Sequence, residues 1–164
     1  MRTLIITRHG KAAEAMESQS DMLRGLSSRG LKDIKIIGRE LSKKNLIPGL
    51  ILSSPAVRSV ETARHLAGCL DISKSVVITR DSLYGNFSNE LFGFMDTICS
   101  NEKVVMVVGH NPSLLILIEY LSGVILESFP TLATLVLDFE IERWSELTEK
   151  KGTLRKLFVP SELR

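Results

Sequence analysis

The sequence predicts an α/β fold, a three-layer sandwich whose central sheet of about five to six strands is mostly parallel, with helices on both faces and an antiparallel C-terminal edge. Short apolar runs alternate with helix-like segments as far as residue 121, which is typical of a parallel sheet built from βαβ units. Residues 103–108 form the most hydrophobic run and suit a strand buried on both faces. After residue 131 only strand-like segments follow, so the last strands are expected to run antiparallel.

In the first half of the chain, strands lead into helices. The expected elements are, in order, a strand at residues 3–7, a loop or short helix at 11–22, a helix from 28 to about 45, a strand at 50–52 and a helix at 56–70. Ser27 or Ser28 is the expected N-cap of the first long helix. Ser53-Ser54-Pro55 predicts a serine cap for the second helix, with proline at its first helical position.

The second half continues the alternation and then changes character. The expected elements are a strand at residues 76–79, a polar turn at 81–89, a helix from 89 to about 101, a strand at 103–108, a helix at 114–121, and strands at 131–139 and 152–159. Trp144 and its neighbours are expected to continue the strand that precedes them. The last strands should form an antiparallel pair that extends one edge of the sheet.

Composition bounds the class of protein. A length of 164 residues and a net charge of +2 favour one domain, residues 1–164, and argue against a nucleic-acid partner. No apolar stretch approaches the roughly 20 residues that cross a membrane, and the N-terminus lacks the pattern of a signal peptide. Cys69 and Cys99 are expected to be buried thiols in a reducing compartment rather than a disulfide. We therefore expect a cytoplasmic protein without a membrane partner.

The first strand ends on Arg8, His9 and Gly10, which are residue types suited to holding an anion. In open α/β sheets, ligands bind outside the carboxyl ends of the strands. Arg8 can present a fork of N–H donors that matches an oxyanion, and His9 can act as a base or a nucleophile near neutral pH. Gly10 lets the backbone turn sharply or approach a ligand closely.

Other residues are expected at the same edge of the sheet. Arg58 falls in the first turn of a predicted helix, where a cation is unfavourable unless an anion lies nearby; a solvated arginine is the alternative. His110 follows the fourth predicted strand, so two of the three histidines occupy strand-to-helix turns. His65 lies deeper in the helix of Arg58 and is interpreted as a structural or surface residue. Together, Arg8, His9, Arg58 and His110 predict an anion-binding site.

A metal site is the alternative use of the two histidines. No third or fourth ligand lies at a recognisable spacing from His9 and His110. Arginine side chains can neutralise a phosphate without a metal ion. We therefore expect neither a metal nor a cofactor.

The chain resembles the histidine phosphatase superfamily, also called the phosphoglycerate-mutase-like fold. The segments that carry the resemblance are Thr7-Arg8-His9-Gly10, Ser53-Ser54-Pro55-Ala56-Val57-Arg58-Ser59-Val60-Glu61-Thr62-Ala63 and Val108-Gly109-His110-Asn111-Pro112. The short length and further segments are similar to the bacterial SixA branch, the phosphohistidine phosphatases: Leu26-Ser27-Ser28-Arg29-Gly30, Leu83-Tyr84, Phe129-Pro130-Thr131 and Trp144. The resemblance covers essentially the full chain.

This resemblance implies a phosphatase that works through a covalent phosphohistidine at His9. It implies that Arg8 and Arg58 bind the phosphoryl group and that His110 donates a hydrogen bond to it. The family segment that usually reads R-P-L is Arg24-Gly25-Leu26 here, and Arg24 is expected to add to the anion pocket. Lys11, after the signature, is interpreted as a solvated loop charge.

The sequence contains no strong candidate for a general acid. The resemblance implies that larger superfamily members place an acid in an insertion after the third strand, but here that region is only residues 81–90, without the usual bulky insertion. Asp81 and Glu90 are the candidates, and each is better explained as a solvated turn or helix-cap carboxylate. A phosphohistidine substrate demands less of an acid than a sugar phosphate does, because the leaving imidazole is protonated easily. We therefore expect an open site, a phosphoprotein substrate of the signalling or phosphotransfer kind, and a monomer. A small-molecule phosphatase of the same superfamily and a catalytically weak phosphate-binding module remain alternatives, and a mutase is disfavoured.

Overall fold

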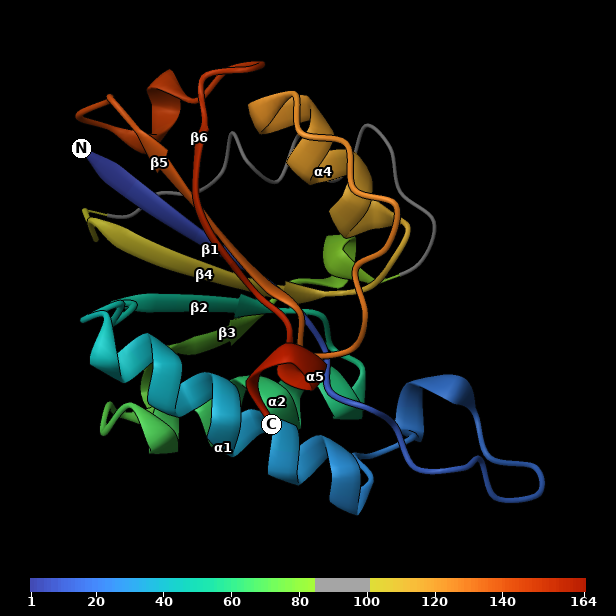
Figure 1. The fold of residues 1–164 in the computed structure, drawn as a ribbon. Helices are drawn as coiled ribbons and strands as arrows, with labels where there is room; N and C mark the ends of the chain where they lie inside the picture. Colours follow the sequence, from blue (N-terminus) through green and yellow to red (C-terminus); the bar gives the residue numbers. More distant parts are fainter. Residues whose placement is uncertain (85–100) are drawn as a thin grey trace.

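The computed structural model describes residues 1–84 and 101–164, which form a mixed sheet of six strands in the order β3-β2-β4-β1-β5-β6 (Figure 1). The strands are β1 (Arg2–Arg8), β2 (Leu50–Ser53), β3 (Val77–Thr79), β4 (Val104–Gly109), β5 (Thr134–Phe139) and β6 (Thr153–Phe158). β1 to β4 run parallel, whereas β5 pairs antiparallel with β1 and β6 pairs antiparallel with β5. The predicted α/β fold, with its antiparallel C-terminal edge, is confirmed.

Helices cover both faces of the sheet (Figure 1). They are α1 (Ser28–Lys43), α2 (Val57–Cys69), α4 (Ser113–Ser122) and α5 (Pro160–Leu163). Alternate residues of β1 enter separate apolar clusters: Ile5 packs with residues of α1 and α2, and Ile6 packs with residues of α4. No helix within the described ranges is long and apolar enough to span a membrane.

The register of the central strands brings the expected site residues together. Arg8 lies opposite Gly109 in the parallel pair of β1 and β4, and Ser53 lies opposite Val108 in the pair of β2 and β4. The backbone N–H of His9 donates to the carbonyl of Gly109 at 3.0 Å. The chain therefore leaves β1, β2 and β4 at one edge of the sheet, and His9 and His110 follow adjacent strands.

The starts of the two long helices differ from each other in how they are capped. Ser27 is the N-cap of α1, and its hydroxyl accepts from the backbone N–H of Gly30 at 3.1 Å. The prediction that Ser27 or Ser28 caps this helix is confirmed. The serine cap predicted for α2 is wrong, because Ala56 is the N-cap and Pro55 lies outside the helix. The reason is that the hydroxyl of Ser54 is engaged elsewhere, with the N–H of Ala56 at 3.2 Å and the ring of His110 at 2.7 Å.

Trp144 does not continue β5, as predicted, but begins a short 3-10 helix, Trp144–Glu146. The carboxylate of Glu146 accepts from the backbone N–H groups of Glu142 and Arg143 at 3.0 and 2.7 Å, which closes a turn in place of a strand. The indole of Trp144 is buried and packs edge-on against Phe139.

The prediction that Cys69 is buried is also wrong. Cys69 is the last residue of α2 and is exposed as a free thiol. The other cysteine of that prediction, Cys99, lies outside the described residues. The helix predicted from residue 89 to about 101 also lies mainly outside them.

Candidate active site

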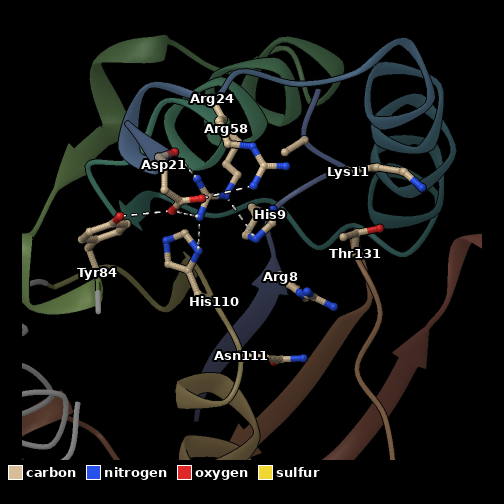
Figure 2. A pocket seen from close by; sticks show the side chains of 11 residues that line it. Arg8, His9, Lys11, Asp21, Arg24, Arg58, Tyr84, His110, Asn111 and Thr131 are labelled. Atoms are coloured by element: carbon tan, nitrogen blue, oxygen red, sulfur yellow. Dashed lines mark hydrogen bonds and ion pairs between the residues drawn. The ribbon is translucent and has the colours of Figure 1, made fainter. Parts of the chain in front are cut away.

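A pocket of about 540 Å³ opens at the edge where β1, β2 and β4 end (Figure 2). The described residues that line it are Arg8, His9, Lys11, Ala12, Asp21, Arg24, Arg58, Tyr84, His110, Asn111 and Thr131. All five residues predicted for the anion site therefore face one cavity: Arg8, His9, Arg24, Arg58 and His110. They come from segments up to about a hundred positions apart, which the parallel sheet brings together.

His9 is held in one tautomer by its own backbone. Its Nδ1 lies 2.7 Å from the carbonyl oxygen of Gly10, and since a carbonyl only accepts, Nδ1 carries the proton. The lone pair is therefore on Nε2, towards which the Nε–H of Arg58 points from 3.5 Å. Burial lowers the pKa of His9 to about 4, opposed by the bond to Gly10 and assisted by the positive charges of Arg58 and Arg8. At neutral pH the ring is uncharged and its Nε2 can act as a nucleophile.

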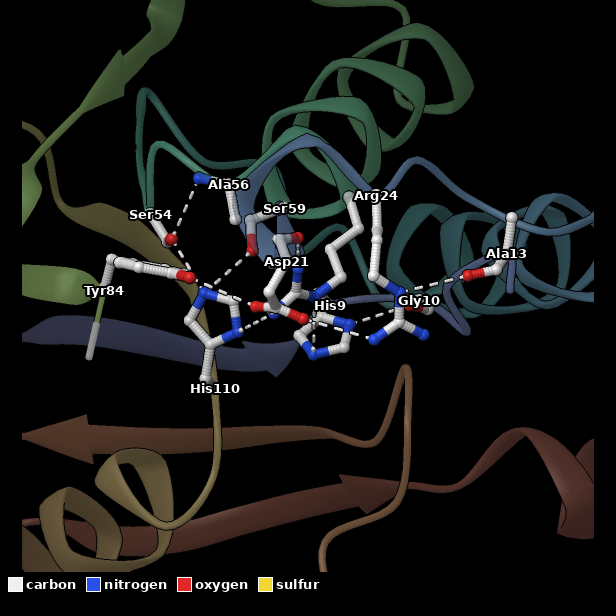
Figure 3. Close-up of polar contacts among 11 residues, drawn as sticks. His9, Gly10, Ala13, Asp21, Arg24, Ser54, Ala56, Ser59, Tyr84 and His110 are labelled. Atoms are coloured by element: carbon white, nitrogen blue, oxygen red, sulfur yellow. Dashed lines mark hydrogen bonds and ion pairs between the residues drawn. The ribbon is translucent and has the colours of Figure 1, made fainter. Parts of the chain in front are cut away.

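His110 has the opposite tautomer. Its Nδ1 faces the guanidinium of Arg58 at 3.5 Å, which can only donate, so the proton lies on Nε2. That N–H reaches the hydroxyl of Ser54 at 2.7 Å, with the hydroxyl of Ser59 further away at 3.4 Å (Figure 3). Burial, then the neighbouring His9 and Arg58, lower the pKa of His110 to about 3. The two imidazole rings are 4.9 Å apart, and both are neutral at pH 7.

Arg58 is the central cation of the pocket. Its side chain is 9% exposed, and its guanidinium donates to the carbonyl of Asp21 at 2.8 Å and to the carboxylate of Asp21 at 2.9 Å. This carboxylate supplies a negative charge beside a cation that would be unfavourable on its own in the first turn of a helix. The alternative, that Arg58 is a solvated surface residue, is thereby excluded.

Arg8 is prepared to bind an anion. Its Nη1 donates to the carbonyl of Phe129 at 3.2 Å, whereas its buried Nε has no partner among the described residues. Burial, and then the positive charge of Arg58, lower the pKa of Arg8, so the two guanidiniums repel each other. A bound oxyanion would relieve this repulsion and would satisfy the buried Nε.

Sequence reasoning missed Asp21, a half-exposed residue that joins three sides of the pocket. Its carboxylate accepts from Arg58, from Arg24 at 3.2 Å and from the hydroxyl of Tyr84 at 3.1 Å. Burial raises the pKa of Asp21, but the hydrogen bonds from these three residues, of which that from Arg58 is the strongest, together hold the pKa below its usual range. One signal was available: Asp21 stands three positions before Arg24, a spacing that allows an ion pair within a short turn.

The remaining predictions have mixed outcomes. Arg24 lines the pocket but donates to Asp21 and, at 3.2 Å, to the carbonyl of Ala13 (Figure 3); its contact with an anion stays a prediction. Asp81 is exposed in a short 3-10 helix and is not among the lining residues, while Glu90 lies outside the described residues. His65 is exposed on α2, and Lys11 is an exposed residue at the rim.

Asn111 was quoted in the sequence only as part of a motif. Its amide nitrogen donates to the carbonyl of Phe129 at 2.8 Å, the same carbonyl that holds Arg8. Asn111 thereby links the segment after β4 to the segment that orients Arg8. Within residues 1–84 and 101–164, no group of three or more histidine, cysteine or acidic side chains is arranged to hold a metal ion.

Comparisons with known proteins agree with this geometry. Residues 4–83 match the family model of the histidine phosphatase superfamily (branch 1), a range that includes Arg8, His9 and Arg58 but ends before His110. The chain is similar to a protein proposed to be the phosphohistidine phosphatase SixA of Agrobacterium tumefaciens, with 27% identity, a TM-score of 0.80, and coverage of 97% of this chain and 98% of that one. No curated protein matches the sequence significantly.

More distant structures share the fold. The protein histidine phosphatase SixA, solved as a complex with tungstate, is 22% identical, with a TM-score of 0.83 and coverage of 99% of each chain. A mycobacterial glucosyl-3-phosphoglycerate phosphatase is 16% identical, with a TM-score of 0.68 and coverage of 93% of this chain and 96% of that one. Together with the family match, these similarities confirm the resemblance seen in the sequence and support a phosphatase.

Proposed function

We propose that this chain removes the phosphoryl group from a phosphohistidine side chain of another protein. The match of residues 4–83 to the family model and the similarity in fold support a phosphatase of the histidine phosphatase superfamily. The observation that carries the proposal is the state of His9. The ring is neutral at pH 7, its Nδ1–H is fixed on the carbonyl of Gly10, and its Nε2 lone pair faces the cationic part of the pocket.

Binding comes first in the proposed reaction. Phosphoryl transfer depends largely on positioning and on neutralising the negative charge of the phosphoryl oxygens. Arg58 and the Nε of Arg8, which has no partner within residues 1–84 and 101–164, supply the donors. A bound dianion would favour protonation of His110, which could then donate from Nδ1 as well. Side chains alone can therefore hold the phosphoryl group.

Two displacements follow. In the first, the lone pair of His9 Nε2 forms a bond to phosphorus while the bond from phosphorus to the leaving nitrogen breaks, and that nitrogen keeps the electron pair. The carbonyl of Gly10 stabilises the positive charge that His9 gains. In the second, a water oxygen attacks phosphorus, the bond to Nε2 breaks and returns its electron pair to His9, and phosphate leaves with the protons of the water.

A protein substrate is supported by the site and by one relative. Asp21 and Lys11 are exposed at the rim of the pocket, so a side chain of another protein could reach the buried cations. The structure with 27% identity is proposed to be a phosphohistidine phosphatase. We extend the proposal to a cytoplasmic monomer that acts on a signalling or phosphotransfer protein and uses no cofactor.

The test is covalent trapping combined with a substrate panel. Brief incubation with a ³²P-labelled phosphohistidine protein should label wild-type protein and His65→Ala, an exposed histidine on α2, but not His9→Ala. Turnover by His9→Ala would contradict the mechanism. In the panel, faster turnover of sugar or nucleotide phosphates than of phosphohistidine protein would favour a small-molecule phosphatase, and binding of phosphate without turnover would favour a regulatory module.

A further inference from the structure

Asp21 is the one carboxylate among the described residues that line the pocket. Resting on the proposed function, we infer that Asp21 binds the leaving imidazole of the substrate, by accepting a hydrogen bond from the ring nitrogen that does not carry the phosphoryl group. Asp21 would thus determine the preference for phosphohistidine over phosphate esters.

The depths of the side chains support this assignment. The side chain of Arg58 is 9% exposed, whereas that of Asp21 is 51% exposed, so the carboxylate lies outward of the cation that it contacts. A phosphoryl group held by the buried cations and attacked by His9 directs the rest of the substrate outward. Figures 2 and 3 both show the carboxylate of Asp21 between the ring of His9 and the hydroxyl of Tyr84. A leaving group directed outward would therefore pass beside this carboxylate.

The charge of Asp21 fits an imidazole and not an alkoxide. The bonds from Arg58, Tyr84 and Arg24 keep Asp21 ionised at neutral pH, so it cannot protonate the oxygen of a departing sugar. An ionised carboxylate can, however, hold a proton on the far nitrogen of an imidazole, because charge-assisted hydrogen bonds are strong. The groups that face this carboxylate are Arg24, Arg58, Tyr84, His9 and His110.

The proton on the far nitrogen decides which species leaves. If that nitrogen is protonated, the bond from phosphorus breaks and the ring departs as neutral imidazole, with no proton transfer to the leaving nitrogen. If it is not, the ring departs as an imidazolate anion, which is a far poorer leaving group. By raising the pKa of the bound ring, Asp21 keeps the substrate reactive at a pH above the ordinary value of imidazole, about 6.5.

A purely structural role makes a different prediction. If Asp21 only orients Arg58 and Arg24, its loss weakens binding of every phosphoryl group, whatever the leaving group and whatever the pH. The comparison therefore needs two substrates, a peptide that carries Nε2-phosphohistidine and p-nitrophenyl phosphate, whose leaving group needs no proton.

The test compares wild type with Asp21→Asn, which keeps the shape and removes the charge. At about pH 8, we expect kcat/KM on the phosphohistidine peptide to fall about 10- to 100-fold, the range of one charge-assisted hydrogen bond, and kcat/KM on p-nitrophenyl phosphate to change only a few fold. At about pH 5.5, where the free ring is already protonated, the defect on the peptide should shrink to the size seen with p-nitrophenyl phosphate. Glu17→Gln, an exposed charge on the same loop, controls for net charge and should match wild type on both substrates.

The outcomes separate the two proposals. Equal losses on both substrates at both pH values, or no loss, would overturn the role of Asp21 while wild-type activity on the peptide kept the proposed function. Wild type that hydrolyses p-nitrophenyl phosphate but not the peptide would overturn the proposed function itself. Circular dichroism and urea unfolding of Asp21→Asn verify that the variant is folded.

Discussion

Removing the ring of His9 should make the protein less sensitive to acid, because a histidine held neutral in the folded state destabilises it as pH falls. The folded pKa of about 4 lies below the unfolded value of 6.5, so the unfolded state binds a proton first. Stability from this group is complete above pH 6.5 and is lost as the pH falls towards 4. Over the full interval from about 4 to 6.5, at about 1.36 kcal/mol per pKa unit, the loss is on the order of 3 kcal/mol.

The magnitude at a working pH follows from the same values. Between about pH 7.5 and about pH 4.5, His9 alone should cost roughly 2–3 kcal/mol of unfolding free energy. Urea unfolding of wild type and His9→Gln at the two pH values measures this difference, since glutamine does not titrate. His110 titrates in both proteins, and because His9 is one of the groups that lower the pKa of His110, the loss due to His110 should be smaller in His9→Gln and should add to the difference. His65→Gln, on the exposed face of α2, controls for the loss of a histidine and should behave as wild type. If wild type and His9→Gln lost the same free energy, the ring of His9 would not be held neutral by its surroundings.

Three further predictions concern the same site. The acid limb of kcat/KM on p-nitrophenyl phosphate should fall near pH 4 and not near 6.5, because protonation of His9 removes its lone pair; a midpoint at 6.5 in a pH–rate profile would contradict the assigned state. Arg58→Lys, which keeps the charge but loses the fork of donors, should lower kcat/KM by about 100-fold, and near-normal steady-state kinetics would show that a point charge suffices. Ser54→Ala should lower the unfolding free energy by about 1–2 kcal/mol, because the N–H of His110 loses its acceptor at 2.7 Å, whereas Ser59→Ala, at 3.4 Å, should cost less in the same urea titration.

The sheet and the core of the site could be predicted because both depend on local patterns. An apolar run such as Val104–Gly109 has few structural alternatives in a chain of this kind, and parallel strands end at a common edge. The two histidines and two arginines of the site lie at the ends of strands or in the first turn of the following helix. The sheet therefore brings them to the same edge. The charge state of His9 could be predicted only in part from the sequence. The arginines lower the pKa of His9 as expected, but burial has the larger effect.

Other features were set by contacts that no local pattern reveals. Asp21 lies in a loop without periodicity, and its position depends on Arg58 and Tyr84, which are 37 and 63 positions away in sequence. Ser54 matched a helix cap by sequence, but its hydroxyl instead holds the ring of His110, which joins the site from a distant strand. Cys69 was expected to be a buried thiol only because no C-x-x-C pair or disulfide was indicated, and it ends α2 at the surface.

The most direct test of the account is to identify the nitrogen that becomes phosphorylated. Protein with ¹⁵N-labelled histidine rings, phosphorylated by a phosphohistidine protein and quenched in alkali, would be analysed by NMR for coupling between phosphorus and each ring nitrogen. The account predicts phosphorus on Nε2 of His9, because Nδ1 donates to the carbonyl of Gly10. Phosphorus on Nδ1 of His9, or on His110, would contradict it.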